Sequence, residues 1–506
     1  MDFQFPKDHE SSSSSTASSL IQRDVECMRD YYRSGITKEA SWRKSQLKAL
    51  LSLLHDNQEH IFNALKQDLG KHHVEAFRDE IGTLIKSLNY ALKNLKQWMS
   101  TKEVKLPKIA LLSTAQVVHE PLGLVLIFSS WNFPIGLSLE PLIGAVAAGN
   151  AVVLKPSELA PMSSSLLAST IPTYLDDKAV KVVQGGSDIG QLLLQHRWDK
   201  IFFTGSARVG KIVMSEAAKY LTPVTLELGG KCPAIVDSLS SSWDRQEAVK
   251  RIVVGKFGTC AGQACISVDY ILVERKFLST LVELMKVTIS KMFGENPRKS
   301  NSIAKIVNEQ HLMRLKGLID DPLVKPSIVY GGSIDEDHLF MEPTILVDPP
   351  LEAQVMADEI FGPVLPIIAL EKIEDSIEFI NSRPKALALY VFTKSKTLQR
   401  RLISETSSGS VNINDAIVQY AADTLPFGGV GESGFGKYHG KFSFETFSHE
   451  KAITKRSFLT DFWFRYPPWS YHKLQLFQNA YNFDYPGMLL VILGLKSHQQ
   501  ASLFNN

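Results

Sequence analysis

The sequence has few cysteines and no apolar run long enough to cross a bilayer. Its four cysteines, Cys27, Cys232, Cys260 and Cys265, are too few for a disulfide scaffold and lack the paired spacing of a zinc site. The apolar stretch at residues 488–495 falls far short of the roughly 20 residues that span a bilayer. We expect a cytoplasmic protein whose C-terminal stretch packs on protein, pairs with a second subunit or lies peripherally on an internal membrane.

The sequence also has no excess of charge of either sign. Its 55 basic and 53 acidic residues leave a net charge of +2, which gives no reason to expect a nucleic-acid partner. The first residues lack a basic segment followed by an apolar core, and their early acids argue against a transit peptide. With the serine tract at residues 11–15, these features predict a disordered tail over residues 1–21.

What the chain does contain is a pattern of alternating helices and strands. At 506 residues it should divide into two or three domains. Residues 22–100 show apolar positions at helical spacing, and Gly and Pro are scarce there. Apolar runs separated by helical segments then predict a parallel sheet covered on both faces. The expected strands are residues 117–118, 124–128, 151–154, 181–183 and 201–203.

A second α/β unit is expected from Gly229-Gly230 to about residues 412–414. It includes a predicted amphipathic helix over residues 247–257, with Val249, Ile252, Val253 and Phe257 on one face. The residues that carry chemistry fall near the junction of the two units. Ligand clefts are common at such junctions.

Three residues suggest an acyl-transfer site. Cys265 lies in the Gly-led loop of residues 262–267, between the predicted helix and the β-rich residues 270–273. A thiol nucleophile, a carboxylate base such as Glu227 and an amide donor such as Asn132 are the parts such a site needs. Taken singly, each has an ordinary structural explanation: Cys265 as a buried apolar residue, Glu227 as a strand end and Asn132 as a turn cap. A free thiol with a pKa of about 8.5 is mostly protonated at neutral pH, so the surroundings of a nucleophile should depress it.

Two further segments are candidates for nucleotide binding. Residues 201–211 read as strand, glycine turn and helix start, in which Gly205, Ser206 and Gly210 bring the backbone and free N–H groups close to a pyrophosphate. The pattern is neither the dinucleotide fingerprint nor a Walker A loop, and a plain turn is the structural alternative. Lys155 and Glu158 follow another apolar strand, where they can bind ribose hydroxyls or simply form a solvated pair. Glu158 would repel a 2′-phosphate, which favours NAD over NADP.

Taken together, these motifs resemble the aldehyde dehydrogenase superfamily, and several are similar to its class 3, or fatty aldehyde, branch. The resemblance covers residues 22–460. It rests on residues 131–134 (Trp-Asn-Phe-Pro), 155–158 (Lys-Pro-Ser-Glu), 205–210 (Gly-Ser-Ala-Arg-Val-Gly), 227–231 (Glu-Leu-Gly-Gly-Lys), 262–265 (Gly-Gln-Ala-Cys), 359–363 (Glu-Ile-Phe-Gly-Pro) and 426–429 (Pro-Phe-Gly-Gly), in family order.

The resemblance implies an α/β fold with a Rossmann-like nucleotide-binding domain, an α/β catalytic domain and a small β oligomerisation arm. It implies oxidation of medium- to long-chain aliphatic or aromatic aldehydes to carboxylic acids with NAD, or with NADP, in aldehyde detoxification. Cys265 would be the nucleophile that forms a thiohemiacetal and then a thioester, and Asn132 with the Cys265 N–H would stabilise the oxyanion. Glu227 is the favoured base and Glu359 the second choice. Glu359 and Phe361 would contact the nicotinamide ribose and ring.

The resemblance also predicts the division of the chain and a homodimer. The apolar segments near Phe444, Phe447 and Phe458 are the candidate dimer contact surface. The expected parts are a disordered tail (1–21), a cofactor-binding domain (22–228) with an oligomerisation hairpin near 106–120, a catalytic domain (229–415), an oligomerisation arm and return segment (416–460) and a C-terminal tail (461–506).

Two alternative functions belong to other classes. A thiol hydrolase would pair Cys265 with His439 or His449, but no histidine motif supports the pairing and the nucleotide segments would have no use. A catalytically retired structural or membrane-associated protein would have been free to lose Cys265, Glu227 and Asn132.

Overall fold

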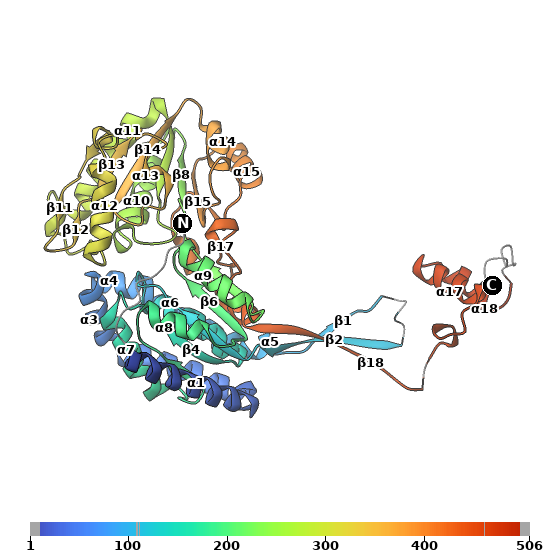
Figure 1. Cartoon of the computed structure of the whole chain (residues 1–506). Coiled ribbons are helices and arrows are strands. Elements are labelled where there is room, and N and C mark those ends of the chain that lie inside the picture. The colour runs from blue at the N-terminus through green and yellow to red at the C-terminus, as the bar shows by residue number, and fades with distance from the viewer. Residues whose placement is uncertain (1–10, 108–109, 111, 460, 496–506) are drawn as a thin grey trace. The chain divides into compact units, whose positions relative to one another are not determined.

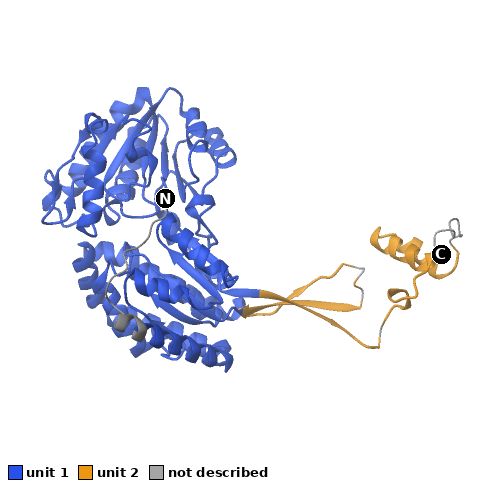
Figure 2. Ribbon diagram, in the orientation of Figure 1, with its two compact units in different colours: residues 1–98, 121–449 blue, residues 99–120, 450–506 orange. Residues whose placement is uncertain are grey.

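The structure is a computed structural model that describes residues 11–107, 110, 112–459 and 461–495, without the side chains of residues 11–16. The chain forms two compact units, one of residues 1–98 and 121–449 and the other of residues 99–120 and 450–506 (Figure 2). The first unit contains every candidate site residue.

The first unit begins with helices, as the apolar spacing predicted. They are α1 (Ser11–Arg33), α2 (Ala40–Asp56), α3 (Gln58–Leu69), α4 (His73–Ala76) and α5 (Gly82–Trp98), with a π-helical turn at Phe77–Ile81. The predicted disorder is wrong for residues 11–21, which lie in α1, and residues 1–10 are outside the described part. Helix α1 is ordered because Ile21, Val25 and Met28, one or two turns apart, are buried in the core beneath the first sheet.

The first sheet has six strands in the order β17-β7-β6-β3-β4-β5, all parallel except β17, which runs antiparallel to β7 (Figure 1). The strands are β3 (Leu124–Phe128), β4 (Ala151–Lys155), β5 (Val180–Val182), β6 (Lys200–Thr204), β7 (Val224–Glu227) and β17 (Gly434–Phe435). The connecting helices are α6 (Gly136–Ala148), α7 (Pro161–Tyr174), α8 (Ser187–Leu194) and α9 (Ala207–Ala218). All residues of β3, β4 and β6 are buried, which confirms the predicted two-sided sheet.

The second sheet has seven strands in the order β10-β13-β14-β9-β8-β15-β16, and only β10 is antiparallel. The strands are β8 (Pro233–Val236), β9 (Tyr270–Glu274), β10 (Ile328–Tyr330), β13 (Thr344–Val347), β14 (Val364–Leu370), β15 (Ala388–Phe392) and β16 (Ser410–Ile413). Its main helices are α10 (Ser242–Phe257), α11 (Arg275–Phe293), α12 (Glu309–Asp320), α14 (Ser376–Asn381) and α15 (Lys396–Glu405), and α16 (Gly440–Thr446) returns to the first sheet to pack on α6. The predicted inner face of α10 is buried at all four positions.

The carboxyl ends of strands in the first sheet lie near the amino ends of strands in the second. Strand β7 ends at Glu227 and the chain enters β8 at Pro233, while Asn132 beyond β3 bonds Gln263 ahead of β9. Strand order in the first sheet reverses between β3 and β6, and such switch points open ligand crevices at the carboxyl ends of the strands.

The second unit contains most of a three-stranded sheet and two C-terminal helices. The sheet has the order β1-β2-β18, formed by β1 (Lys102–Val104), β2 (Ser113–Pro121) and β18 (Ser448–Arg456). Helices α17 (Tyr471–Tyr481) and α18 (Tyr485–Ile492) pack around Phe464, Leu476 and Val491. Among the residues described, no helix is long and apolar enough to cross a membrane.

The structure corrects two of the three predicted dimer contacts. Phe444 and Phe447 are wholly buried in the first unit, where Phe444 packs on Trp98 and Phe447 on Phe202, at centroid distances of 5.8 and 5.7 Å. A side chain used in this way within one chain is not available to a partner. Phe458, in contrast, is fully exposed.

Candidate active site

Cys265 lies in a turn between α10 and β9, as the glycine pattern predicted. Three successive residues before it, Cys260, Ala261 and Gly262, have positive φ angles of 48°, 50° and 78°. At Gly262 a side chain would meet the carbonyl groups of Gly362 and Lys256, so only glycine fits this reversal. The loop therefore places a half-buried thiol at the amino edge of the second sheet.

The surroundings of the thiol do not depress its pKa. Burial raises the pKa of Cys265, and the carboxyl groups of Glu359 and Glu227 raise it further. The backbone N–H groups of Cys265 and Ile266 act in the opposite direction but are outweighed. The thiol is therefore protonated at neutral pH in this state, contrary to the expectation for a preformed thiolate, and its attack requires a base.

Glu227 is the last residue of β7, with Thr204 opposite it on one side and Gly434 on the other. The side chain is only 2% exposed, and neither carboxyl oxygen has a hydrogen-bond partner among the described residues. Burial raises the pKa of Glu227 well above its ordinary value. Burial of a carboxyl group without a hydrogen-bond partner lowers the stability of the folded state. Buried groups with strongly shifted pKa values are typical of functional sites.

Glu359 precedes β14 and lies against Gly229, so that a Cβ atom at Gly229 would collide with its carboxyl group. Burial and then the charge of Asp269 raise the pKa of Glu359 to about 8, against the effects of the Gly230 N–H and of Lys231. Lys231 holds the loop in place, because its Nζ bonds Asp269 Oδ2 at 2.6 Å and the carbonyl oxygens of Val355 and Asp358 at 2.8 and 3.1 Å.

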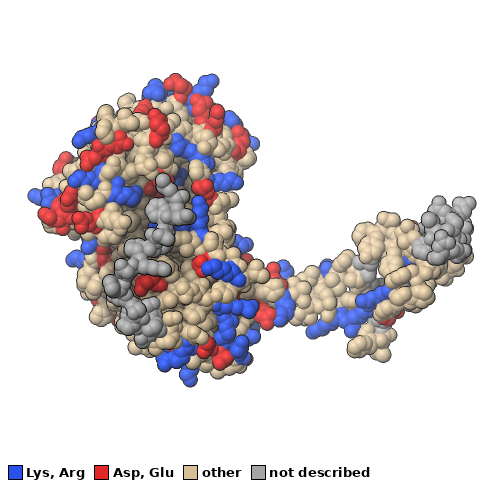
Figure 3. Space-filling view, viewed as in Figure 1, with Lys and Arg blue, Asp and Glu red and all other residues tan. Residues whose placement is uncertain are grey.

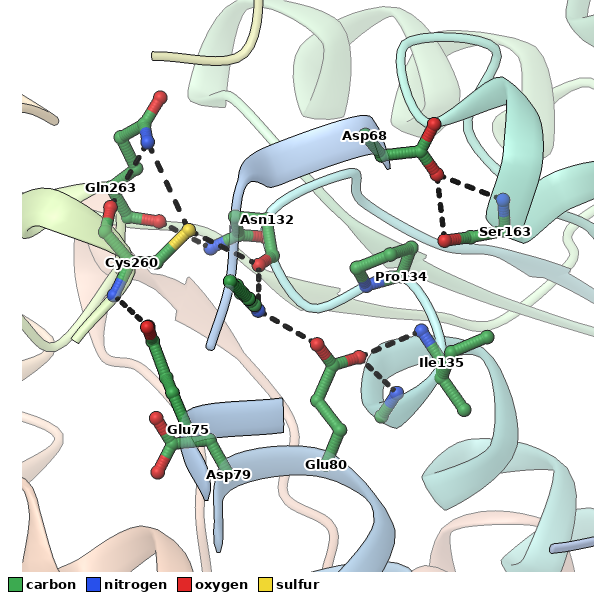
Figure 4. Close-up of polar contacts among 12 residues, drawn as sticks. Asp68, Glu75, Asp79, Glu80, Asn132, Pro134, Ile135, Ser163, Cys260 and Gln263 are labelled. Carbon is green, nitrogen blue, oxygen red and sulfur yellow. Dashed lines mark hydrogen bonds and ion pairs between the residues drawn. The ribbon is translucent and has the colours of Figure 1, made fainter. Parts of the chain in front are cut away.

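Asn132 follows β3 and approaches the thiol loop directly. Its Nδ2 donates to the carbonyl oxygen of Gln263 at 2.9 Å, which leaves the second amide hydrogen for another acceptor. The Asn132 carbonyl oxygen accepts a hydrogen bond from Lys71 Nζ at 2.7 Å (Figure 4). Lys71, Glu75 and Glu80 were not predicted as site residues, because no local pattern marks a charged residue that tertiary contacts will bury.

The predicted nucleotide residues gather at the carboxyl ends of β4 and β6, which flank β3. Lys155 Nζ donates to Glu158 Oε2 at 2.5 Å, with Lys155 buried and Glu158 partly exposed. Ser206 caps α9 by accepting the Val209 N–H at 3.4 Å. Any side chain at Gly205 would collide with the Phe203 ring, and Gly210 packs closely on Leu228. The remaining N–H groups in the first turn of α9 suit the phosphates of a dinucleotide.

Aromatic side chains surround the junction. The rings of Phe361 and Trp131 meet edge to face at 5.3 Å, across the two sheets. Burial raises the pKa values of Tyr420 and Tyr438, and both lie close enough to Cys265 for an ionised thiol to raise them further. Phe427 stacks on His439 at 5.2 Å.

The geometry gives no support to a cysteine–histidine pair. His439 is buried among aromatic rings, and neither of its ring nitrogens has a hydrogen-bond partner in the described part of the chain. Burial and the nearby Lys86 lower its pKa to about 3, so it stays neutral. His449 is exposed on β18. The described residues contain no cluster of three or more His, Cys, Asp or Glu that could hold a metal ion.

The arrangement thus combines a thiol, two buried carboxyl groups and an amide donor near strand ends and a helix N-terminus that suit a dinucleotide. Comparison with known proteins finds relatives of similar sequence and fold. The sequence profile described as "Aldehyde dehydrogenase family" matches residues 13–453. "Aldehyde dehydrogenase family 3 member F1" of Arabidopsis thaliana is 54% identical over 94% of this chain and 98% of its own length. "Aldehyde dehydrogenase, dimeric NADP-preferring" of Rattus norvegicus is 43% identical over 89% of this chain and 98% of its own length.

A solved structure shows the same fold. The substrate-bound state of Staphylococcus aureus AldH superposes with a TM-score of 0.86 at 39% sequence identity, over 92% of this chain and 99% of that one. The predicted combination of a Rossmann-like domain and an α/β catalytic domain is confirmed.

Proposed function

The chain belongs to the aldehyde dehydrogenase family, and on this premise we propose that Cys265, Glu227, Glu359 and Asn132 form its catalytic centre. The enzyme oxidises aldehydes to carboxylic acids with NAD or NADP, in line with its similarity to family 3 members. The proposal rests on one observation, the meeting of the Cys265 thiol with two buried carboxyl groups at the junction of the sheets.

In the first step Cys265 Sγ attacks the aldehyde carbon. The ionised form of Glu227 or of Glu359 takes up the thiol proton as the carbon–sulfur bond forms, because the thiol does not ionise on its own in this site. The free hydrogen on Asn132 Nδ2 and the Cys265 backbone N–H stabilise the oxyanion of the thiohemiacetal. Loss of one such donor typically costs about 100- to 1000-fold in turnover.

A bound nicotinamide would accept the hydride from the former carbonyl carbon, which leaves a thioester on Cys265. After the carboxyl group has released the thiol proton to solvent, a water molecule attacks the thioester carbon and gives one proton to the carboxylate. The carbon–sulfur bond then breaks, the carboxylic acid leaves, and the Cys265 thiolate takes back the proton from the carboxyl group. Glu227 is the favoured base because neither of its carboxyl oxygens has a partner among the described residues. Since its pKa is raised, it acts as a base only after it has lost its own proton. Glu359 is the second candidate.

The residues at the strand ends fit a dinucleotide. Gly205, Ser206 and Gly210 bring the backbone of the α9 N-terminus to the crevice, and Lys155 with Glu158 would bind the adenine ribose. The partly exposed Glu158 carboxylate favours NAD over NADP by repelling a 2′-phosphate. Glu359 and Phe361 would contact the nicotinamide half. In this division residues 22–228 bind the cofactor and residues 229–415 carry the thiol.

For the substrate we propose apolar aldehydes, aliphatic of medium to long chain or aromatic. The half-buried Tyr420 and the buried Phe427 and Tyr438, which cluster near the thiol, support this class. The test is NADH formation with a panel from acetaldehyde to long-chain and aromatic aldehydes. A preference for acetaldehyde over the longer members would contradict the proposed class.

The second unit supports two further proposals. The exposed Phe458 and Leu459 beyond β18 would contact a second copy in a homodimer, as the word "dimeric" in the rat relative's name suggests. Analytical ultracentrifugation of wild type and Phe458→Ser should show a dimer that weakens in the variant.

The C-terminal helices would make a peripheral contact with an internal membrane of an otherwise cytoplasmic enzyme. Their visible face is largely uncharged (Figure 3), and Trp469, Phe483 and Leu493 are more than half exposed. Lys473 is the one Lys or Arg residue within α17 and α18. Flotation with anionic vesicles tests this contact, and a protein that stays at the bottom of the gradient would contradict it.

A further inference from the structure

A buried charged network joins the helical N-terminal segment to both loops of the proposed site. The Lys71 ammonium is inaccessible to solvent and pairs with Glu80 at 2.7 Å, and neither side chain is exposed (Figure 4). Glu80 is carried by the π-helical turn, an irregularity often found at functional sites. Lys71 precedes α4 and follows the left-handed Gly70 that ends α3.

This pair holds both ends of the segment that carries Asn132. Lys71 Nζ donates to the Asn132 carbonyl oxygen at 2.7 Å and lies 4.0 Å from the Phe133 ring centroid. The other oxygen of Glu80 accepts the N–H groups of Ile135 and Gly136 at 2.9 and 3.0 Å. These N–H groups belong to the start of α6, where backbone donors have no partner within the helix.

The same segment also holds the thiol loop. Glu75 Oε1 accepts the Cys260 N–H at 2.7 Å, within the strained run of positive φ angles. The Cys260 thiol donates to the Asn132 carbonyl oxygen at 3.4 Å, the atom that Lys71 also contacts. Asn132 Nδ2 closes the ring of contacts by donating to Gln263, two residues before Cys265.

We propose that Lys71 and Glu80 are positioning residues that fix the Asn132 amide relative to the Cys265 thiol for oxyanion stabilisation. This inference rests on the proposed roles of Asn132 and Cys265. A buried ion pair adds little net stability compared with apolar residues of similar size, so stability alone does not explain its presence. The Lys71–Glu80 pair contacts the backbone of the segment that carries the Asn132 amide, and this positioning explains why the pair is present.

The test uses a variant that removes both charges together, Lys71→Met with Glu80→Gln. The glutamine side chain in place of Glu80 keeps an oxygen for the N–H groups of Ile135 and Gly136, so the start of α6 stays capped while the bond to the Asn132 carbonyl is lost. We expect kcat to fall about 10- to 100-fold, below the loss for removing an oxyanion donor outright, with KM for NAD little changed.

The decisive measurement is a double-mutant cycle with Asn132→Ala. If the pair acts through Asn132, the two charge-removing substitutions should have almost no further effect on kcat in the Asn132→Ala background. Equal fold-losses in both backgrounds would overturn the proposal and assign the pair a general structural role. An unchanged kcat in the charge-removed variant would overturn it as well.

A matched control comes from the same helical segment. Asp68 is also buried and caps another helix, accepting the N–H groups of Met162 and Ser163 at 3.0 and 2.8 Å at the start of α7. Asp68→Asn should shift the thermal unfolding midpoint but leave kcat within about twofold. Wild-type enzyme that forms no NADH would refute the proposed function itself, an outcome separate from the cycle.

Discussion

The carboxyl group of Glu359 lies directly against the α-carbon of Gly229, two residues beyond Glu227. The lack of a side chain at Gly229, just beyond β7, therefore allows the Glu359 carboxyl group to lie close to the chain that carries Glu227. Both acids raise the pKa of the same thiol. The acid–base chemistry of the site thus depends on a glycine, with no side chain, at position 229.

Replacement of Gly229 by alanine should displace Glu359, because the new Cβ atom and the carboxyl group would need the same space. We expect kcat to fall about tenfold or more, as a displaced base or cofactor contact loses its geometry. Gly317→Ala is the matched control, since nothing lies within 4 Å of a Cβ at this position in α12. The control should keep full activity, and its unfolding free energy should rise by up to about 1 kcal/mol. Equal activity of the two variants would argue against this role of Gly229.

Cys265→Ala should abolish aldehyde-dependent NADH formation, with a loss of at least about 1000-fold, because no other group can form the thioester. Cys27→Ala, which alters an exposed thiol on α1, is the control and should behave as wild type. Steady-state rates at saturating aldehyde and NAD provide the measurement. Substantial NADH formation by Cys265→Ala would refute the nucleophile assignment.

Glu227→Gln should be more stable than wild type but nearly inactive. The pKa of Glu227 is raised in the folded state, so wild type loses stability as pH rises above the ordinary carboxyl value of 4.5 and the unfolded chain ionises. The gain in unfolding free energy from the substitution should therefore be small at pH 5 and larger at pH 8. Denaturant titrations at both pH values measure it, and a gain that shrinks with pH would contradict the assignment.

Turnover should depend on pH through Glu359, whose pKa is raised to about 8. If it acts as the base in place of Glu227, kcat should rise as pH increases through 8, because the ionised carboxylate becomes available. Glu359→Gln should remove this rise. A profile that keeps the same rise in the variant would leave Glu227 as the base.

Glu158→Gln should improve the use of NADP relative to NAD, because it removes the charge that repels a 2′-phosphate. We expect the ratio of kcat/KM values to shift about tenfold toward NADP, the effect of roughly 1.4 kcal/mol. Glu216→Gln removes an acid on α9 that pairs with Lys219, and it should leave the ratio unchanged. A shift of the same size in both variants would point to net charge rather than a local contact.

Much of this protein is determined by local sequence alone. The apolar runs of β3, β4 and β6 and the face of α10 specify their structure because burial on one or two faces imposes a period that is visible in the chain. The glycine turn at residue 205 and the loop before Cys265 are equally local, since few other residues adopt the required backbone. These features also carried the resemblance to the family.

Only the tertiary structure determined the pKa values in the site and the buried contacts that hold its loops in place. Lys71, Glu75 and Glu80 read as ordinary polar residues of a helical segment, and long-range packing alone buries them against Asn132 and Cys260. The thiol pKa is raised rather than depressed because two acids, 38 and 94 residues away in sequence, converge on it. Phe444 and Phe447 are core residues because they pack on Trp98 and Phe202, which lie far away in the sequence. Burial and charge pairing depend on which distant segments meet, and no local pattern in the sequence encodes that.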